Sequence, residues 1–157
     1  MLRLSKMADY AAVVLATMAD RPAEQHTSVA LAERTGLARP TVSKLLKALA
    51  QSGLVVARRG INGGYSLARA PAAISAVDMI EAIDGPFAMT ECTLAPGLCE
   101  LEPNCRLGAQ WRHLSLTVRR TLADITLEDL IGEPIVPRFT KPGLERLSTV
   151  SYMERKT

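Results

Sequence analysis

The sequence predicts a mainly α-helical protein that also contains a small β-hairpin. Apolar residues recur at steps of three and four over residues 5–51 and again over residues 107–130, which is the pattern of helices with one buried face. Between these stretches, the segment "LVVARRGINGGYSLA" places two short runs of strand-forming residues on either side of a glycine-rich turn. Aromatic residues make up only 4% of the chain, so we expect a core that is mostly aliphatic.

Three helices are expected before the hairpin. The first covers residues 5–18, where apolar residues recur at helical spacing. The second covers residues 28–34, because Thr27 is a favourable N-cap and Gly36 a favourable stop. The third covers residues 40–51, because a proline fits the first turn of a helix.

The hairpin is expected to join strands at residues 54–58 and 65–68. The Asn-Gly-Gly run at residues 62–64 supplies the positive φ angles that its turn needs. Three helices followed by a hairpin is the layout of a winged helix-turn-helix domain, which we expect over residues 1–70.

The remaining chain divides into three parts. Residues 71–106 hold a fourth helix within "SAVDMIEAIDGP", followed by a segment that contains every cysteine of the chain. Residues 107–131 are expected to form one long helix that runs unbroken to about Leu130. Residues 132–157 contain three prolines and weak periodicity, which predicts a flexible tail.

The N-terminal segment "MLRLSKMADYAAVVLATMADRPA" resembles a signal peptide in its early basic residues and the apolar run that follows. However, Asp9 interrupts the two, and Met7, Ala11, Val14 and Met18 recur at the spacing of a helix packed on a core. No apolar run reaches the roughly 18 residues that a membrane span needs. We therefore expect a cytoplasmic protein with no membrane partner.

Charge is unevenly distributed along the chain. Residues 1–70 carry ten Lys/Arg and four Asp/Glu, a net charge of +6, whereas residues 71–131 carry four and nine, a net charge of −5. A basic first half predicts a domain that binds a polyanion. Because no phosphate-binding glycine loop in a strand–helix context and no nucleophile–base motif is present, we do not expect an enzyme.

The third predicted helix and the hairpin carry a pattern typical of DNA binding. Apolar residues form a buried stripe on the helix, and the remaining positions present cations and hydrogen-bonding groups suited to a major groove. Arginines at the hairpin suit flanking phosphates or a minor groove. The candidate DNA-binding residues are Arg39, Thr41, Ser43, Lys44, Lys47, Arg58 and Arg59. Each feature alone also fits a solvated helix face or an ordinary hairpin, but their combination favours DNA binding.

The three cysteines, Cys92, Cys99 and Cys105, have the spacing C-x6-C-x5-C. An odd number of cysteines argues against a disulfide framework, and the spacing differs from the short knuckles of zinc fingers. Long spacings suit a segment wrapped around an iron–sulfur cluster. Buried structural cysteines, a zinc site and a metal-free redox sensor are the alternatives.

A fourth ligand is needed to complete a four-ligand site. His113 lies eight residues after Cys105, and Asp9 is an unexpected carboxylate in an apolar first helix. The carboxylates in or beside the cysteine segment, which are Glu91, Glu100 and Glu102, are further candidates.

In these motifs the chain resembles a known family, the bacterial winged-helix iron–sulfur transcription regulators of the IscR/NsrR type. The resemblance covers residues 1–132 and rests on "LRLSKMADYA", on "LVVARRGINGGYSLA" with its "RG-x-x-GGY" motif, on "ISAVDMIEAIDGP" before the cysteines, and on "AQWRHLS…TLADITLEDLI". The opening is most similar to the regulators of the SUF iron–sulfur assembly operon.

The resemblance implies a homodimer that binds double-stranded operator DNA. The long helix is then a dimerisation helix that crosses its twin, with a seam formed by Trp111, Leu114, Val118, Leu122 and Ile125. It also implies an iron–sulfur cluster on the three cysteines, with the [2Fe–2S] type favoured over [4Fe–4S].

The family also bears on the fourth ligand. IscR-like members carry a histidine three residues after the last cysteine, where this chain has Gly108. NsrR-like members use an aspartate before a tyrosine near the N-terminus of the partner subunit, and this chain has Asp9-Tyr10 there. The resemblance therefore favours Asp9 of the partner subunit, with His113 as second choice. IscR carries a glutamate where this chain has Ser43, so the role of that glutamate in the choice between operator types does not carry over to this chain.

The resemblance predicts a regulator, and more specifically a repressor, of iron–sulfur assembly genes that senses cluster status. The alternatives are a nitric-oxide or redox sensor and a cluster-containing electron-transfer protein.

Overall fold

A computed structural model describes residues 3–61 and 63–132 of the chain. It is mostly helical with one two-stranded antiparallel hairpin, which confirms the predicted fold class. The elements in order are α1 (Lys6–Ala19), α2 (Ser28–Thr35), α3 (Arg39–Gln51), β1 (Val55–Arg58), β2 (Gly64–Leu67), the 3₁₀ turn η1 (Pro71–Ala73), α4 (Ala76–Asp84), α5 (Glu91–Leu94), the 3₁₀ turn η2 (Glu102–Asn104), α6 (Gly108–Ala123) and α7 (Leu127–Ile131). The tail predicted over residues 132–157 lies, apart from Gly132, outside the described residues.

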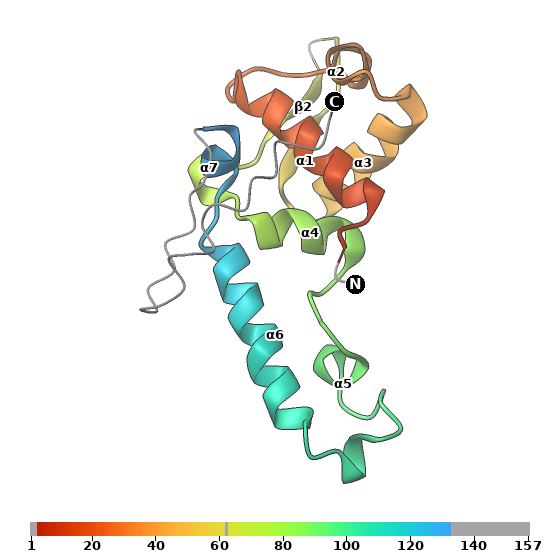
Figure 1. Cartoon of the computed structure of the whole chain (residues 1–157). Coiled ribbons are helices and arrows are strands. Elements are labelled where there is room, and N and C mark those ends of the chain that lie inside the picture. The colour runs from red at the N-terminus through yellow and green to blue at the C-terminus, as the bar shows by residue number, and fades with distance from the viewer. Residues whose placement is uncertain (1–2, 62, 133–157) are drawn as a thin grey trace, which may run out of the picture.

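The molecule is elongated along α6. Helices α1, α2 and α3 and the hairpin lie at one end, and α5 lies towards the other (Figure 1). Helix α4 packs against α1 and α3 on one side and against α6 on the other, so it joins the two parts. None of the helices in residues 3–61 and 63–132 is both long and apolar enough to cross a membrane.

The core lies among α1, α2, α3 and the start of α4. Its fully buried large side chains are aliphatic, as the composition predicted: Val14, Leu15, Met18, Leu31, Val42, Leu45, Leu46, Leu49, Leu54, Ile74 and Leu127. The α3 members of this set are the predicted buried stripe of that helix. Burial of this stripe leaves the other face of α3 to solvent.

The hairpin is tied to the helices by a third extended segment. In the hairpin, Val55 pairs with Leu67 and Arg58 with Gly64. On the other side of β2, His26 and Tyr65 exchange two main-chain hydrogen bonds of 2.8 Å. A Cβ on Gly64 would lie 2.8 Å from the carbonyl oxygen of His26, so only glycine allows this close approach.

The glycines of the turn follow the sequence prediction only in part. Gly64 has a positive φ of +159°, as predicted, and Gly60 has a φ of +113°, whereas Gly63 is not among the glycines with positive φ. Gly63 is instead required for space, because a Cβ there would clash with the main chain of Arg58 and Gly60. Asn62 lies outside the described residues.

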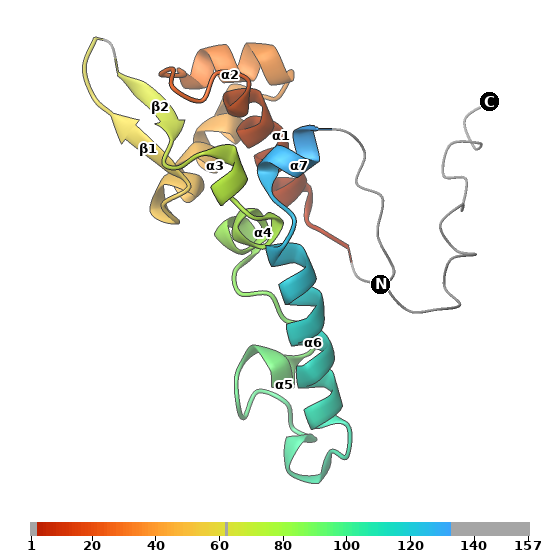
Figure 2. The same cartoon turned by 90° about the vertical axis from the view of Figure 1, so that its left-hand side faces the viewer.

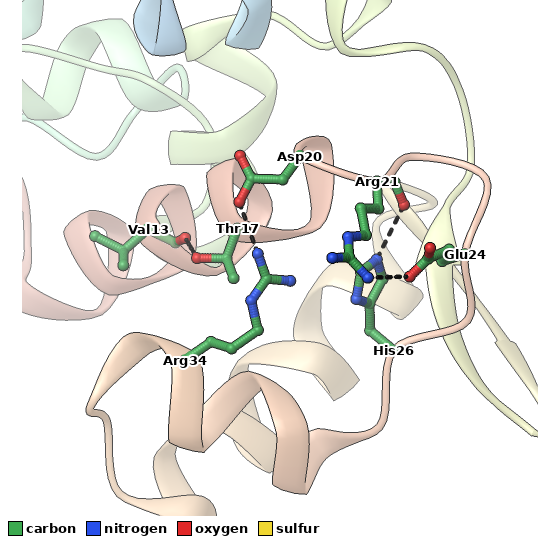
Figure 3. Close-up of polar contacts among 7 residues, drawn as sticks. All are labelled: Val13, Thr17, Asp20, Arg21, Glu24, His26 and Arg34. Carbon is green, nitrogen blue, oxygen red and sulfur yellow. Dashed lines mark hydrogen bonds and ion pairs between the residues drawn. The ribbon is translucent and has the colours of Figure 1, made fainter.

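The connection between α1 and α2 is held by local polar contacts (Figure 3). The guanidinium of Arg34 forms an ion pair with Asp20 at 2.7 Å, which joins the two helices. The buried His26 donates from Nε2 to the carbonyl oxygen of Arg21 at 3.1 Å. These contacts position α2, the first helix of the helix-turn-helix, relative to α1.

The prediction of one long helix over residues 107–130 is wrong. Helix α6 ends at Ala123, and a new helix, α7, begins at Leu127. Thr126 and Asp129 form a capping box that starts α7. The intervening chain pairs with the start of α4, through hydrogen bonds of 2.7 Å from Ala76 N to Ile125 O and from Leu127 N to Ile74 O. These contacts turn α7 back so that it packs against α1 and η1.

Candidate nucleic-acid interface and cysteine segment

The outward face of α3 is basic and polar. Ser43, Lys44 and Lys47 are exposed on it, as predicted. Arg39, the first residue of the helix, is also exposed and reaches Glu33 of α2 at 3.4 Å. The N-cap is Ala38, whose side chain has no hydrogen-bond acceptor, and Pro40 has no amide hydrogen, so only the amides of Arg39 and Thr41 are left without a capping partner.

Thr41 and Lys44 lie towards the edges of this face. Thr41 is half-buried, so less of its side chain is available than that of Ser43. Lys44 borders a pocket of about 270 Å³ between α3, the start of α1 and the end of α4. Asp84 lines the same pocket, so Lys44 lies at the edge of the outward face rather than at its centre.

The hairpin extends beyond the helices, with its tip away from α6 (Figure 2). Arg58 and Arg59 are both exposed near this tip. Within residues 3–61 and 63–132, no carboxylate lies within ion-pairing distance of Arg58, Arg59, Lys44 or Lys47. The hairpin is also fastened at its base, where Arg69 forms an ion pair with Asp78 of α4 at 3.2 Å.

The cysteine segment runs from α5 to the start of α6, and its three thiols have different surroundings. Cys92 lies in α5, is 8% exposed and has its Sγ 3.2 Å from the hydroxyl of Thr90. Cys99 is half-buried and Cys105 is exposed just after η2. Short helices such as α5 have little intrinsic stability, so their shape depends on tertiary contacts.

The structure of the single chain does not gather the predicted ligands. Across the two described ranges, no three His, Cys, Asp or Glu side chains are close enough to share a metal ion. Asp9 is exposed in the first turn of α1, and α4 lies between α1 and α5 in both views (Figures 1 and 2). His113 is exposed in the second turn of α6.

Glu102 has a role that the sequence did not indicate. Its carboxylate accepts a hydrogen bond of 2.8 Å from the amide of Gly97 and lies 3.5 Å from Arg112 of α6. It therefore holds the cysteine segment in a loop against α6. Of the carboxylates considered as ligands, it is the one with structural partners, whereas Glu91 and Glu100 are exposed.

Glu81 and Arg119 form a second junction that sequence reasoning missed. Two hydrogen bonds join the carboxylate on α4 to the guanidinium on α6, at 2.8 and 3.0 Å. Glu81 also accepts the amide of Phe87, which lies just before the cysteine segment, at 3.1 Å. The two charged residues are 38 positions apart, so no local pattern in the sequence relates them.

The apolar stripe on α6 is only partly used within the chain. Trp111 and Leu114 are 37% and 42% exposed. Leu122 and Ile125, which were also predicted to belong to the seam, are partly buried and pack against the core of their own chain. Val118 and Leu122 also line a pocket of about 360 Å³ together with Phe87 of the segment that leads to α5.

These features define a winged-helix protein with a basic, outward-facing third helix and a cysteine-containing segment on a long second part. Comparison with known proteins agrees with this class. The Rrf2 profile, described as an iron-dependent transcriptional regulator, matches residues 4–133. The chain therefore belongs to the Rrf2 family of transcriptional regulators.

Individual relatives and solved structures are consistent with this assignment. The HTH-type transcriptional regulator IscR of Xenorhabdus nematophila is 31% identical over 131 residues, which is 83% of this chain and 79% of that protein. An HTH-type transcriptional regulator of Mycobacterium tuberculosis is 34% identical over 134 residues, 83% of this chain and 82% of that protein.

Two solved structures share the fold. The structure of IscR from T. potens has a TM-score of 0.60 at 26% identity and covers 83% of this chain and 86% of that one. CymR, the global cysteine regulator of B. subtilis, has a TM-score of 0.64 at 27% identity and covers 83% of this chain and 97% of that one. Both relatives described above are named as transcriptional regulators.

Proposed function

We propose that this protein is a homodimeric, cytoplasmic repressor of iron–sulfur assembly genes that senses cluster status through Cys92, Cys99 and Cys105. The observation that carries the proposal is the position of the three cysteines. They lie in one segment that packs through α5 on α6, in a chain that belongs to a family of DNA-binding regulators.

In this proposal, α3 enters the major groove of an operator with its basic face. Lys47 and Arg39 contact phosphates or guanine edges, and Ser43 contacts a base or phosphate near the N-terminal end of the helix. The uncapped amides of Arg39 and Thr41 can add uncharged contacts to a phosphate. In a two-fold symmetric dimer, the two α3 helices meet half-sites about one helical turn, roughly 34–36 Å, apart.

The proposed dimer uses the exposed stripe of α6. Trp111 and Leu114 remain open to solvent in the single chain, and Leu107 one turn earlier is exposed as well. The steps of four and three residues between these positions place them on one face of the helix. Packing of this face against the second subunit would bury them.

The donor chemistry of the cysteine segment fits an iron–sulfur cluster. Thiolates are the usual protein ligands of such clusters, and three of them here need one more donor. We place Asp9 of the partner subunit in the fourth position, because Asp9 of the same chain belongs to α1 at the winged-helix end. A bound cluster would supply iron–thiolate bonds to the segment. These bonds would form when iron and sulfide are available and would be lost when oxidants destroy the cluster. The one-turn helix α5 and the turn η2 must reshape to bring the thiols together.

Residues of the chain then carry a change in the segment to the DNA-binding part. The segment is joined to α6 by Glu102 and Arg112, and α6 is joined to α4 by Arg119 and Glu81. Helix α4 packs directly on α3. A shift of α4 therefore changes the separation of the two α3 helices in the dimer. DNA binding depends on this separation, because it must match the spacing of the two half-sites.

The proposal is tested by anaerobic purification of the full chain, with iron and acid-labile sulfide analysis and absorption spectroscopy. DNA affinity is then measured for cluster-loaded and apo protein on duplexes selected from a random pool. We expect coloured protein whose cluster state changes affinity by about 5–150-fold, the usual range of allosteric coupling.

The alternatives give different results in the same measurements. If brief exposure of the cluster-loaded protein to nitric oxide changes its DNA affinity to that of the apo protein, the result would indicate a nitric-oxide sensor. A colourless, zinc-loaded protein would contradict the cluster, and cluster-loaded protein without selective DNA binding would favour electron transfer.

A further inference from the structure

The tip of the hairpin presents an isoleucine that plays no part in the fold. The exposed fraction of Ile61 is 105%, the highest among the exposed large apolar side chains of the described residues. Its neighbours Arg58 and Arg59 are exposed too. None of the apolar surface of this side chain is used in the fold, so it is available to a partner.

The backbone around Ile61 is constrained. The amide of Gly63 donates to the carbonyl of Gly60 at 2.9 Å, which closes the turn in which Ile61 lies. A side chain on Gly63 would clash with the main chain of Arg58, and Gly60 takes a φ of +113°. The contacts of Gly60 and Gly63 thus keep Ile61 at the end of the hairpin.

The charges near Ile61 indicate the kind of partner. The segment of residues 54–68 contains two arginines next to Ile61 and no acidic residue. An apolar side chain beside exposed cations suits the minor groove of DNA, where arginines are attracted by the negative potential and apolar wedges insert between base pairs. We propose that Ile61 inserts as an apolar wedge at a base step in the minor groove next to the major groove that α3 reads.

This inference rests on the proposed operator binding and adds a source of sequence selectivity to it. Pyrimidine–purine steps such as TA and CA are the easiest to kink and unstack. A wedge at the hairpin tip therefore favours operators with such a step at the flank of each half-site, although no hydrogen bond reads those bases. The selectivity acts through deformation of the DNA rather than through base edges.

The test uses the full chain and a duplex recovered from random DNA by repeated selection with the unaltered protein. Ile61→Ala removes the wedge, Ile61→Met keeps an apolar side chain, and Leu130→Ala removes an exposed leucine from α7 as a matched control. Arg59→Ala reports independently whether the hairpin contacts DNA.

We expect Ile61→Ala to weaken binding by about 10–100-fold, since the three side-chain carbons that it removes lose their burial. The slope of affinity against salt should stay unchanged, because no charge is removed, whereas Arg59→Ala should reduce that slope by about 1. Ile61→Met and Leu130→Ala should bind as the unaltered protein does. A 2-aminopurine at the flanking step should brighten on binding of the unaltered protein but not of Ile61→Ala.

The outcomes that overturn the proposal are separable. If Ile61→Ala matches Leu130→Ala while Arg59→Ala lowers the salt slope, the hairpin binds DNA but Ile61 is no wedge. If Arg59→Ala also has no effect, the hairpin does not contact DNA and Ile61 has no site there. If selection recovers no preferred duplex, the proposed operator binding fails together with the wedge.

Discussion

Arg119 of α6 binds Glu81 of α4 through two parallel hydrogen bonds, Nε to Oε1 at 2.8 Å and Nη2 to Oε2 at 3.0 Å. This fork-to-fork geometry is the strongest form of arginine–carboxylate pair. The hydrogen bonds from Arg119 hold the pKa of the Glu81 carboxyl below its usual value, and the amide of Phe87 lowers it further, against the opposing effect of burial. The pair therefore joins the winged-helix part to the part that carries the cysteines.

We expect Glu81→Gln to lower the free energy of unfolding at neutral pH by about 0.5–1 kcal/mol, because the pair is partly exposed to solvent. The exposed fractions of the two side chains are 25% for Glu81 and 45% for Arg119. Chemical denaturation measures the difference, with Glu100→Gln, an exposed residue of the cysteine segment, as control. An equal effect of both substitutions would contradict a structural role of the pair.

The same pair predicts a dependence on pH. Because the pKa of Glu81 is lower in the folded than in the unfolded protein, its stabilising contribution is complete above the ordinary glutamate pKa. The contribution is lost as pH falls through the folded-state pKa, so the difference between the unaltered protein and Glu81→Gln should begin to shrink near the ordinary glutamate pKa and vanish in more strongly acidic solution. Denaturation curves recorded across this range measure it, and a difference that persists in acid would contradict the ionic origin.

The basic face of α3 predicts a salt-dependent contact with phosphate. Lys47→Ala should weaken binding to all duplexes and reduce the salt slope of affinity by about 1, because one cation no longer displaces counterions. Arg106→Ala removes an exposed cation from the cysteine segment and should leave the slope unchanged. DNA titrations at several salt concentrations measure the two slopes. Equal slopes for the two variants would show that Lys47 does not contact phosphate.

The proposed fourth ligand predicts an order of effects on the cluster. Asp9→Ala should shorten the lifetime of the bound cluster more than His113→Ala, since both side chains are exposed in the single chain but only Asp9 is placed at the site by the proposed dimer. Absorbance decay in air and iron content measure this. A larger effect of His113→Ala would indicate that His113, and not Asp9, is the fourth ligand of the cluster.

The exposed stripe of α6 predicts where the dimer can be broken. Leu114→Glu places a charge among apolar side chains at the seam and should shift the protein to monomers, because burial of an unpaired charge is costly. Ala123→Glu adds the same charge at another exposed position of α6 and should leave the dimer intact. Sedimentation velocity distinguishes the two species. Dissociation by both variants would indicate a general effect of charge.

Short-range rules predicted most of the winged-helix part. Thr27 caps α2 and Gly36 ends it with a φ of +71°, as the sequence indicated. The buried stripe of α3 followed from the spacing of its leucines, because a helix brings every third and fourth residue to one face. Such features depend on neighbours in the chain, so the chain alone specifies them.

The break between α6 and α7 was missed for a different reason. The apolar spacing continues through residues 122–127, so the pattern alone favours one helix. The main-chain bonds of Ile125 and Leu127 to the start of α4, and the cap at Thr126, outweigh this preference. Leu122 and Ile125 consequently belong to the core of their own chain, although their spacing also fits a seam.

By itself, the sequence determined the fold class, the basic face of α3 and the position of all three cysteines in one segment, because these depend on local periodicity and on residue type. The tertiary structure decided which of the apolar residues of α6 stay exposed, that Arg119 pairs with Glu81, and that Glu102 holds the cysteine segment against α6. Those relationships join residues that are distant in the chain or lie on separate elements. They depend on how the helices pack, which periodicity within any one element does not encode.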